Sequence, residues 1–117
     1  MIITSYNIRG LGGGQIFLSL KISSDLIKPD VILIQETMVD AGKACNSLLK
    51  IFPGWEVCAT NVVGLSGGLL YIWNPSRADF VAYYTPPGIL LEGKLKGYAE
   101  VVHIINFYAP YRDREVF

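Results

Sequence analysis

The order of apolar and polar positions predicts alternating strands and helices in the first part of the chain. Residues 2–8 have the pattern of a strand, which the glycines at positions 10, 12, 13 and 14 interrupt. Apolar residues at positions 16, 17, 20 and 27 share one helical face, and this segment ends before Pro29. Residues 31–34 form a continuous apolar run, as expected for a strand that is buried on both faces.

A second helix is predicted after Asp40, a residue type that caps helix N-termini. Apolar residues follow at helical spacing, and this is the clearest stripe in the chain: Ala41, Ala44, Cys45, Leu48, Leu49 and Phe52. Pro53 and Gly54 end the stripe.

The second half of the chain changes to strand patterns. Apolar runs cover residues 55–60, 68–73, 80–84 and 100–107, and turn sequences occupy 74–76 and 86–88. A strand–helix–strand–helix order followed by a meander predicts an α/β (α+β) fold. We expect a mixed β-sheet with helices on one face.

Composition narrows the class of protein. The 117 residues form one domain or part of one, with a formal net charge of zero and a pI near 6.5. A stand-alone nucleic-acid-binding module usually has a basic surface, which this chain lacks, but an enzyme that binds phosphate through a metal remains compatible. The hydrophobic share of 51% and the mean hydropathy of +0.37 are high for a free domain, so we expect a further protein layer to cover it.

Targeting signals and cysteines add little. No apolar run approaches the roughly 18 residues of a membrane span, and no signal peptide is visible, which favours a protein of the nucleus or cytoplasm that does not enter a membrane. Cys45 and Cys58 are too few for a disulfide framework or a zinc site, so we expect buried free thiols.

Two polar residues end the first two predicted strands. Asn7 lies at the end of the first strand and Glu36 at the end of the second, and a right-handed strand–helix–strand unit brings these ends to one edge of the sheet. An amide oxygen and a carboxylate are hard ligands that suit Mg²⁺, with Mn²⁺ as an alternative ion. Two structural alternatives stay open: Glu36 could cap a turn or meet a lysine, and Asn7 could bond the following glycine backbone.

Four motifs occur in order along the chain: Ser5-Tyr6-Asn7-Ile8-Arg9-Gly10-Leu11, then Asp30 to Gln35-Glu36-Thr37, then Ser66-Gly67-Gly68-Leu69-Leu70, and then Asn106-Phe107-Tyr108-Ala109-Pro110. Together they resemble the endonuclease/exonuclease/phosphatase superfamily. Within it, the chain looks most like the endonuclease domain of plant non-LTR (LINE-type) retrotransposons. The resemblance covers nearly the whole chain but only the first half of the family domain.

This resemblance implies a Mg²⁺-dependent phosphodiesterase that acts on DNA. It assigns the metal to Asn7 and Glu36 and contact with the scissile phosphate to Tyr108. Arg9 and Arg112 become candidate phosphate-binding residues, although solvated arginines are the alternative. The glycines near the site, whose role would be structural, are Gly10, Gly67 and Gly68.

The sequence also departs from the family pattern. Arg9 stands where several relatives carry aspartate, and Tyr111 stands where asparagine often follows the proline. The Asp-x-Asn and Ser-Asp-His motifs of the family are missing, and the only histidine, His103, is expected to be a core or edge residue. We therefore expect residues 1–117 to be a truncated domain, half of a four-layer α/β sandwich, with little activity alone.

Two other functions remain open. A dinucleotide-binding module is suggested by the glycines that precede the first helix, although Gln15 stands where the fingerprint needs glycine. The chain could instead be a non-catalytic remnant that binds a second polypeptide, or itself, through an exposed sheet face.

Overall fold

The first 35 residues form the predicted strand–helix–strand unit. The computed structural model describes residues 1–8, 14–60, 62–63, 66–85 and 88–107. In it, β1 (Ile3–Asn7) is followed by α1 (Gly14–Ile27) and β2 (Val31–Gln35). β1 and β2 pair in parallel, from Ile3 opposite Val31 to Asn7 opposite Gln35. Both strands therefore end at the same edge of the sheet.

The second helix, α2 (Ala41–Ile51), begins and ends where its sequence signals stand. The Asp40 side chain accepts a hydrogen bond from the Lys43 backbone N–H at 3.0 Å, which satisfies one of the unpaired donors of the first turn. Ala44 and Leu48 are buried on its inner face. After the helix, Gly54 takes a φ of +83°, a conformation that glycine adopts without steric cost.

The first sheet is mixed, as predicted, and has the strand order β1-β2-β6-β3. β3 (Glu56–Ala59) and β6 (Leu69–Trp73) are antiparallel to each other, and β6 is also antiparallel to β2. All five residues of β6 are buried, because other layers cover both faces of this strand. A short hairpin of β4 (Val62–Val63) and β5 (Ser66–Gly67) lies between β3 and β6 in sequence.

A second, antiparallel sheet follows, with the order β7-β8-β9. It contains β7 (Ala78–Thr85), β8 (Gly88–Leu95) and β9 (Val102–Phe107). Its central strand, β8, is missing from the strands that the sequence pattern predicted. Gly93 lies within this strand and is required there, because a Cβ at this position would collide with the Asp79 carbonyl oxygen of β7.

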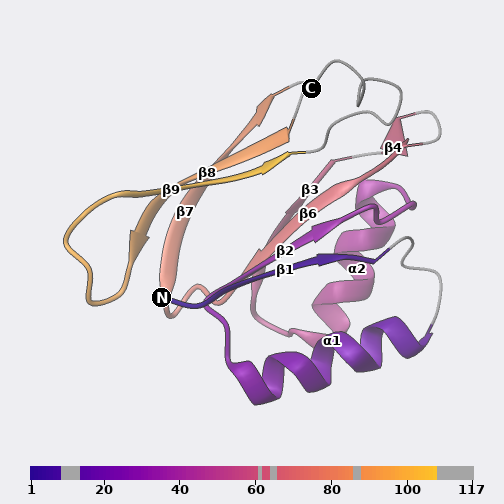
Figure 1. Ribbon diagram of the computed structural model, residues 1–117, viewed down its shortest axis with the longest axis horizontal. Coiled ribbons are helices and arrows are strands. Elements are labelled where there is room, and N and C mark those ends of the chain that lie inside the picture. Colours follow the sequence, from indigo (N-terminus) through magenta and orange to yellow (C-terminus); the bar gives the residue numbers. More distant parts are fainter. Residues whose placement is uncertain (9–13, 61, 64–65, 86–87, 108–117) are drawn as a thin grey trace.

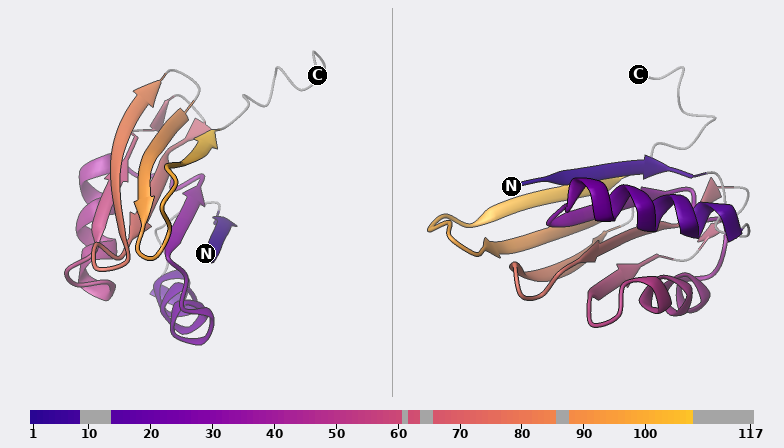
Figure 2. Two further views of the ribbon diagram at one scale, coloured as in Figure 1. Left: turned by 90° about the vertical axis from the view of Figure 1, so that its left-hand side faces the viewer. Right: turned by 90° about the horizontal axis from the view of Figure 1, so that it is seen from below.

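The elements stack in three layers (Figure 1, Figure 2). Both helices lie on one face of the mixed sheet and the antiparallel sheet lies on the other. The helix-side core joins Leu20 of α1 and Leu48 of α2 to Ile34 of β2, among others. The predicted mixed sheet with helices on one face is therefore confirmed.

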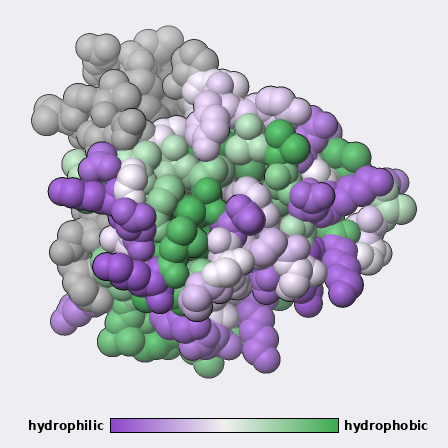
Figure 3. Space-filling model, turned by 180° about the vertical axis from the view of Figure 1, so that it is seen from behind, coloured by the Kyte–Doolittle hydropathy of each residue, from purple (hydrophilic) through white to green (hydrophobic). Residues whose placement is uncertain are grey.

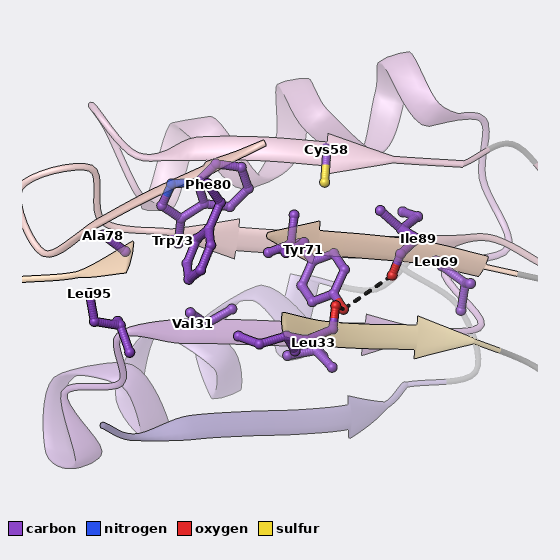
Figure 4. Packing of buried hydrophobic residues seen from close by; sticks show 12 residues of the cluster. Val31, Leu33, Cys58, Leu69, Tyr71, Trp73, Ala78, Phe80, Ile89 and Leu95 are labelled. Atoms are coloured by element: carbon purple, nitrogen blue, oxygen red, sulfur yellow. Dashed lines mark hydrogen bonds between the residues drawn. The ribbon is translucent and has the colours of Figure 1, made fainter. Parts of the chain in front are cut away.

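The core between the two sheets is larger and contains one buried phenol (Figure 4). Tyr71 is fully buried, and its hydroxyl group lies 2.7 Å from the Ile104 carbonyl oxygen and 3.2 Å from that of Ile89. These carbonyls belong to β9 and β8, so the side chain of a strand in the first sheet binds the backbone of the second. Trp73 and Phe80 pack edge to face in the same core, with ring centroids 5.6 Å apart.

Expectations from the sequence also concern the two cysteines, His103 and the helices. Cys58 is a buried free thiol as expected, whereas Cys45 on α2 is only half-buried and is also free. His103 lies exposed on the edge strand β9, where it pairs with Glu92 at 3.3 Å. Within the part of the chain that the structure describes, neither helix has the length and apolar character needed to cross a membrane.

Candidate functional site

The ends of β1 and β2 place Asn7 and Glu36 beside each other. Asn7 is the register partner of Gln35, and Glu36 is the next residue of the neighbouring strand. Adjacent strands lie about 4.8 Å apart, so the backbones of Asn7 and Glu36 are close neighbours. Asn7 is exposed and Glu36 is half-buried. Asn7 and Glu36 thus lie at one edge of the sheet, as the sequence predicted. Their binding of a metal stays a prediction.

The loop after β2 holds Glu36 in an unusual backbone conformation. Glu36 and Met38 have φ angles of +56° and +60°, in the left-handed region that costs a non-glycine residue about 1–2 kcal/mol. Thr37 between them is buried, with 1% of its surface exposed. Such a turn persists only where the surrounding residues hold it in place.

Gly68 is the neighbour that holds this loop. Its carbonyl oxygen accepts a hydrogen bond from the Thr37 N–H at 3.3 Å, and its φ is +69°. A Cβ on Gly68 would overlap the Thr37 hydroxyl oxygen, so only glycine fits here. That hydroxyl is buried and has no hydrogen-bond partner in the described part of the chain. Gly68 therefore sets the position of Thr37 and, through it, of Glu36.

A network of polar side chains, buried at Asn106, also supports this edge of the sheet. The Gln35 Nε2 atom donates to Asn106 Oδ1 at 3.0 Å and lies 3.1 Å from Ser5 Oγ. Asn106, which is 1% exposed, points its Nδ2 atom at the carbonyl oxygens of Leu70 and Ile34, at 3.2 and 3.4 Å. One amide of β9 thus binds β2 and β6 directly and β1 through Gln35.

Asn106 was not among the predicted site residues, although its motif was noticed. The available signal was a polar amide at an inward position of an apolar strand, where an unpaired polar group would be costly. The hydrogen-bond partners of Asn106 lie on strands far away in sequence, so the pattern of residues around position 106 does not predict them.

Charge at this edge is sparse in the described part of the chain. The Glu36 carboxylate makes no hydrogen bond or ion pair with another described residue. No group of three or more His, Cys, Asp or Glu side chains is close enough to hold a metal, again among the described residues. Among the described residues, the candidate ligands for a metal here are therefore one carboxylate and one amide.

The cysteines do not provide an alternative chemistry. Burial raises the pKa of the Cys58 thiol to about 12, and it also raises the pKa of the Cys45 thiol. A thiol is nucleophilic only as thiolate, so neither cysteine is activated at neutral pH. Burial likewise raises the pKa of the Tyr71 phenol, which stays neutral as a hydrogen-bond donor.

The remaining predicted site residues divide into four outside the described residues and one in the short hairpin. Arg9, Gly10, Tyr108 and Arg112 lie outside the described residues. Gly67 is the last residue of β5, opposite Val62.

The chain is similar in fold to a protein of known structure. No family model matches the chain, and no curated protein sequence matches it either. Among solved structures, the chain matches a crystal structure of D. rerio TDP2, humanized by 14 mutations, with a TM-score of 0.64 and 14% sequence identity. The fold is that of TDP2. The match covers 97% of this chain and 49% of TDP2, so the chain spans about half the length of that protein. At this identity the likeness to TDP2 establishes the fold and leaves the activity to be argued from the site.

Proposed function

We propose that this chain is part of a metal-dependent phosphodiesterase domain of the endonuclease/exonuclease/phosphatase superfamily. The likeness of fold to TDP2, over 97% of this chain, agrees with the proposal. The observation that carries the proposal is the placement of Asn7 and Glu36 on adjacent strand ends within this fold. The four motifs found in order along the sequence support the same superfamily.

The residues at this edge fit a magnesium ion. Mg²⁺ usually keeps several waters and is held by one or two carboxylates together with substrate phosphates. Glu36 would supply the carboxylate and Asn7 the amide oxygen, and Gly68 and Thr37 keep Glu36 at the strand end. When bound, such an ion neutralises charge on a phosphodiester and polarises it toward attack. With two candidate ligands among the described residues, we expect weak binding in the absence of substrate.

A substrate is proposed from the motif resemblance alone. The resemblance of its motifs to LINE-type retrotransposon endonucleases suggests DNA as the substrate, with Tyr108, Arg9 and Arg112 contacting its phosphates. We expect the 117-residue chain alone not to nick DNA, because it contains neither an Asp-x-Asn nor a Ser-Asp-His sequence. Loss of general acid–base groups typically removes about 10²–10⁴-fold of rate.

A paramagnetic probe tests the metal site without requiring activity. Mn²⁺ added to the folded chain should broaden the NMR signals of residues around positions 7 and 36. Glu36→Gln, which removes the charge and keeps the shape, should abolish this local broadening. Glu56→Gln is the matched control, because Glu56 is an exposed carboxylate in β3 and should leave the broadening unchanged. Broadening that survives Glu36→Gln, or that centres elsewhere, would contradict the metal assignment.

Nicking of supercoiled plasmid in Mg²⁺ tests the activity. The proposal expects none from the isolated chain. Mg²⁺-dependent nicking that Glu36→Gln abolishes would show that the chain is a complete enzyme, against the proposal that it is only part of one.

A dinucleotide-binding module is the weaker alternative. Such folds repeat the strand–helix–strand unit along a parallel sheet. Among the described strands of the first sheet, β1 and β2 form the one parallel pair, and β6 runs antiparallel to both of its neighbours, β2 and β3. A non-catalytic role through association with another polypeptide has more support, since large apolar side chains are exposed along two strands.

A further inference from the structure

Two strand edges lie open on the same side of the molecule. Among the described residues, β1 pairs only with β2 and β9 pairs only with β8. Figure 2 shows in both views that β1 and β9 border the same side, which faces the reader in Figure 1. We call this surface, formed by Met1–Asn7 and Val101–Phe107, the open side.

The backbone of β1 is ready to accept another strand there. Ile2 and Ile8 make backbone hydrogen bonds to the β2 segment, the first through its carbonyl oxygen and the second through its N–H. Parallel pairing alternates along a strand, so the N–H and C=O groups of Ile3, Ser5 and Asn7 point toward the open side. Unpaired edge groups of this kind are a template for adding strands.

The open side also lacks the features that usually protect an edge. β1 and β9 contain no Lys, Arg, Asp, Glu or Pro, the residues that natural proteins place on edges to block pairing. The opposite edges differ, because β3 carries Glu56 and β7 carries Asp79, both exposed. Figure 3 shows that hydrophilic residues are spread over that opposite side, around a strip of hydrophobic ones.

Large apolar side chains are exposed along the same two strands. The exposed fractions are 39% for Ile3, 61% for Ile105 and 63% for Phe107, and Met1, Ile2 and Val101 are also exposed. The formal net charge of the chain is zero, so two copies do not repel each other through a net charge.

We propose that the open side binds the open side of a second copy of this chain. A twofold axis perpendicular to both sheets would pair β1 with β1 and β9 with β9, each antiparallel, so that both sheets continue across one isologous interface. Such a dimer is closed, because each copy has used its open side. Since the match covers 97% of this chain and 49% of TDP2, two copies have about as many residues as that protein. This inference concerns the 117-residue chain by itself, and its test reads the oligomeric state and not metal binding or nicking.

Sedimentation equilibrium of the full 117-residue chain tests the proposal. The wild-type chain should be a dimer that dissociates on dilution. Ile3→Pro removes an N–H that points to the open side while keeping the β2 pairing, and Ile105→Lys places a charge on the β9 edge. Each substitution should give a monomer with an unchanged circular dichroism spectrum.

Leu18→Lys is the matched control. Leu18 is as exposed as Ile105, at 61%, but it belongs to α1 and to neither edge strand, so this variant should stay dimeric. A wild-type monomer at every concentration would overturn the proposal. A dimer that both edge variants leave intact, or an open-ended polymer, would also overturn it.

Amide hydrogen exchange gives a measurement that needs no variant. The Ser5 N–H points to the open side, so its exchange should slow as the protein concentration rises. The Tyr6 N–H points to β2 and should change far less. If Ser5 exchange is independent of concentration while the chain is dimeric, the interface lies elsewhere.

Discussion

Gly68 is the single residue on which the loop after β2 depends most directly. Its left-handed backbone and its missing side chain are both needed, the first for the turn into β6 and the second for the contact with Thr37. Sequence reasoning placed this glycine beside the site, because the Ser66-Gly67-Gly68 motif precedes an apolar strand. It could not show that the close neighbour is Thr37, which belongs to a loop about thirty residues earlier in the chain.

Gly68→Ala should therefore lower stability and disturb Glu36. The left-handed φ alone costs alanine about 1–2 kcal/mol, and the collision with Thr37 adds to this. Gly54→Ala isolates the first cost, since Gly54 also has a positive φ but no atom lies within 4 Å of an added Cβ. Urea unfolding should show a larger loss for Gly68→Ala than for Gly54→Ala. Equal losses would mean that the Thr37 contact adjusts without cost.

At the scale of elements, sequence signals were reliable where the pattern is local. The boundaries of α2 follow from Asp40 before it and Pro53-Gly54 after it. Ala44, Leu48 and Phe52 of its apolar stripe pack on the mixed sheet, whereas Leu49 is exposed. The strand β8 was missed, because the residues that make it a strand are its neighbours β7 and β9. Propensity disfavours Gly93 inside a strand, but pairing on both sides outweighs it.

Asp40→Ala should destabilise α2 by about 1 kcal/mol, the usual cost of losing an N-cap side chain. The physical reason is that the Lys43 N–H would lose its acceptor. Asp25→Ala is the control, since Asp25 makes an exposed i,i+4 pair with Lys21 that is worth only about 0.2–0.5 kcal/mol. Thermal unfolding followed by circular dichroism measures both variants. A smaller effect for Asp40→Ala than for Asp25→Ala would show that the cap does not stabilise the helix.

The whole molecule is held together by polar contacts between its two sheets as well as by the core. Near the candidate site, Asn106 joins β9 to β2 and β6. In the middle, the Tyr71 hydroxyl binds the backbone of β9. At the other end, Arg77, just before β7, binds the buried Asp30 carboxylate at 3.0 Å, and Asp30 also accepts from the Ile2 N–H. These contacts fix how the second sheet sits on the first.

Tyr71→Phe removes one of these contacts while keeping the ring. We expect the free energy of unfolding to fall by about 1–3 kcal/mol, because a buried carbonyl loses its donor. Tyr83→Phe serves as the control, since Tyr83 lies on β7 with 48% of its surface exposed and should have little effect. Urea titration of both variants measures the difference. An unchanged midpoint for Tyr71→Phe would show that this contact adds nothing to stability.

The sequence by itself determined the elements whose signals are local and the position of two polar residues at strand ends. A parallel strand–helix–strand unit follows from periodicity and caps, and it brings Asn7 and Glu36 to one edge without further information. Only the tertiary structure decided that Asn106 lies beneath this edge, that Gly68 holds the loop of Glu36, and that β1 and β9 border one open side. Gln35 and Asn106 are 71 residues apart in the chain. Contacts of that kind arise from the stacking of whole sheets, and no periodicity along the chain encodes them.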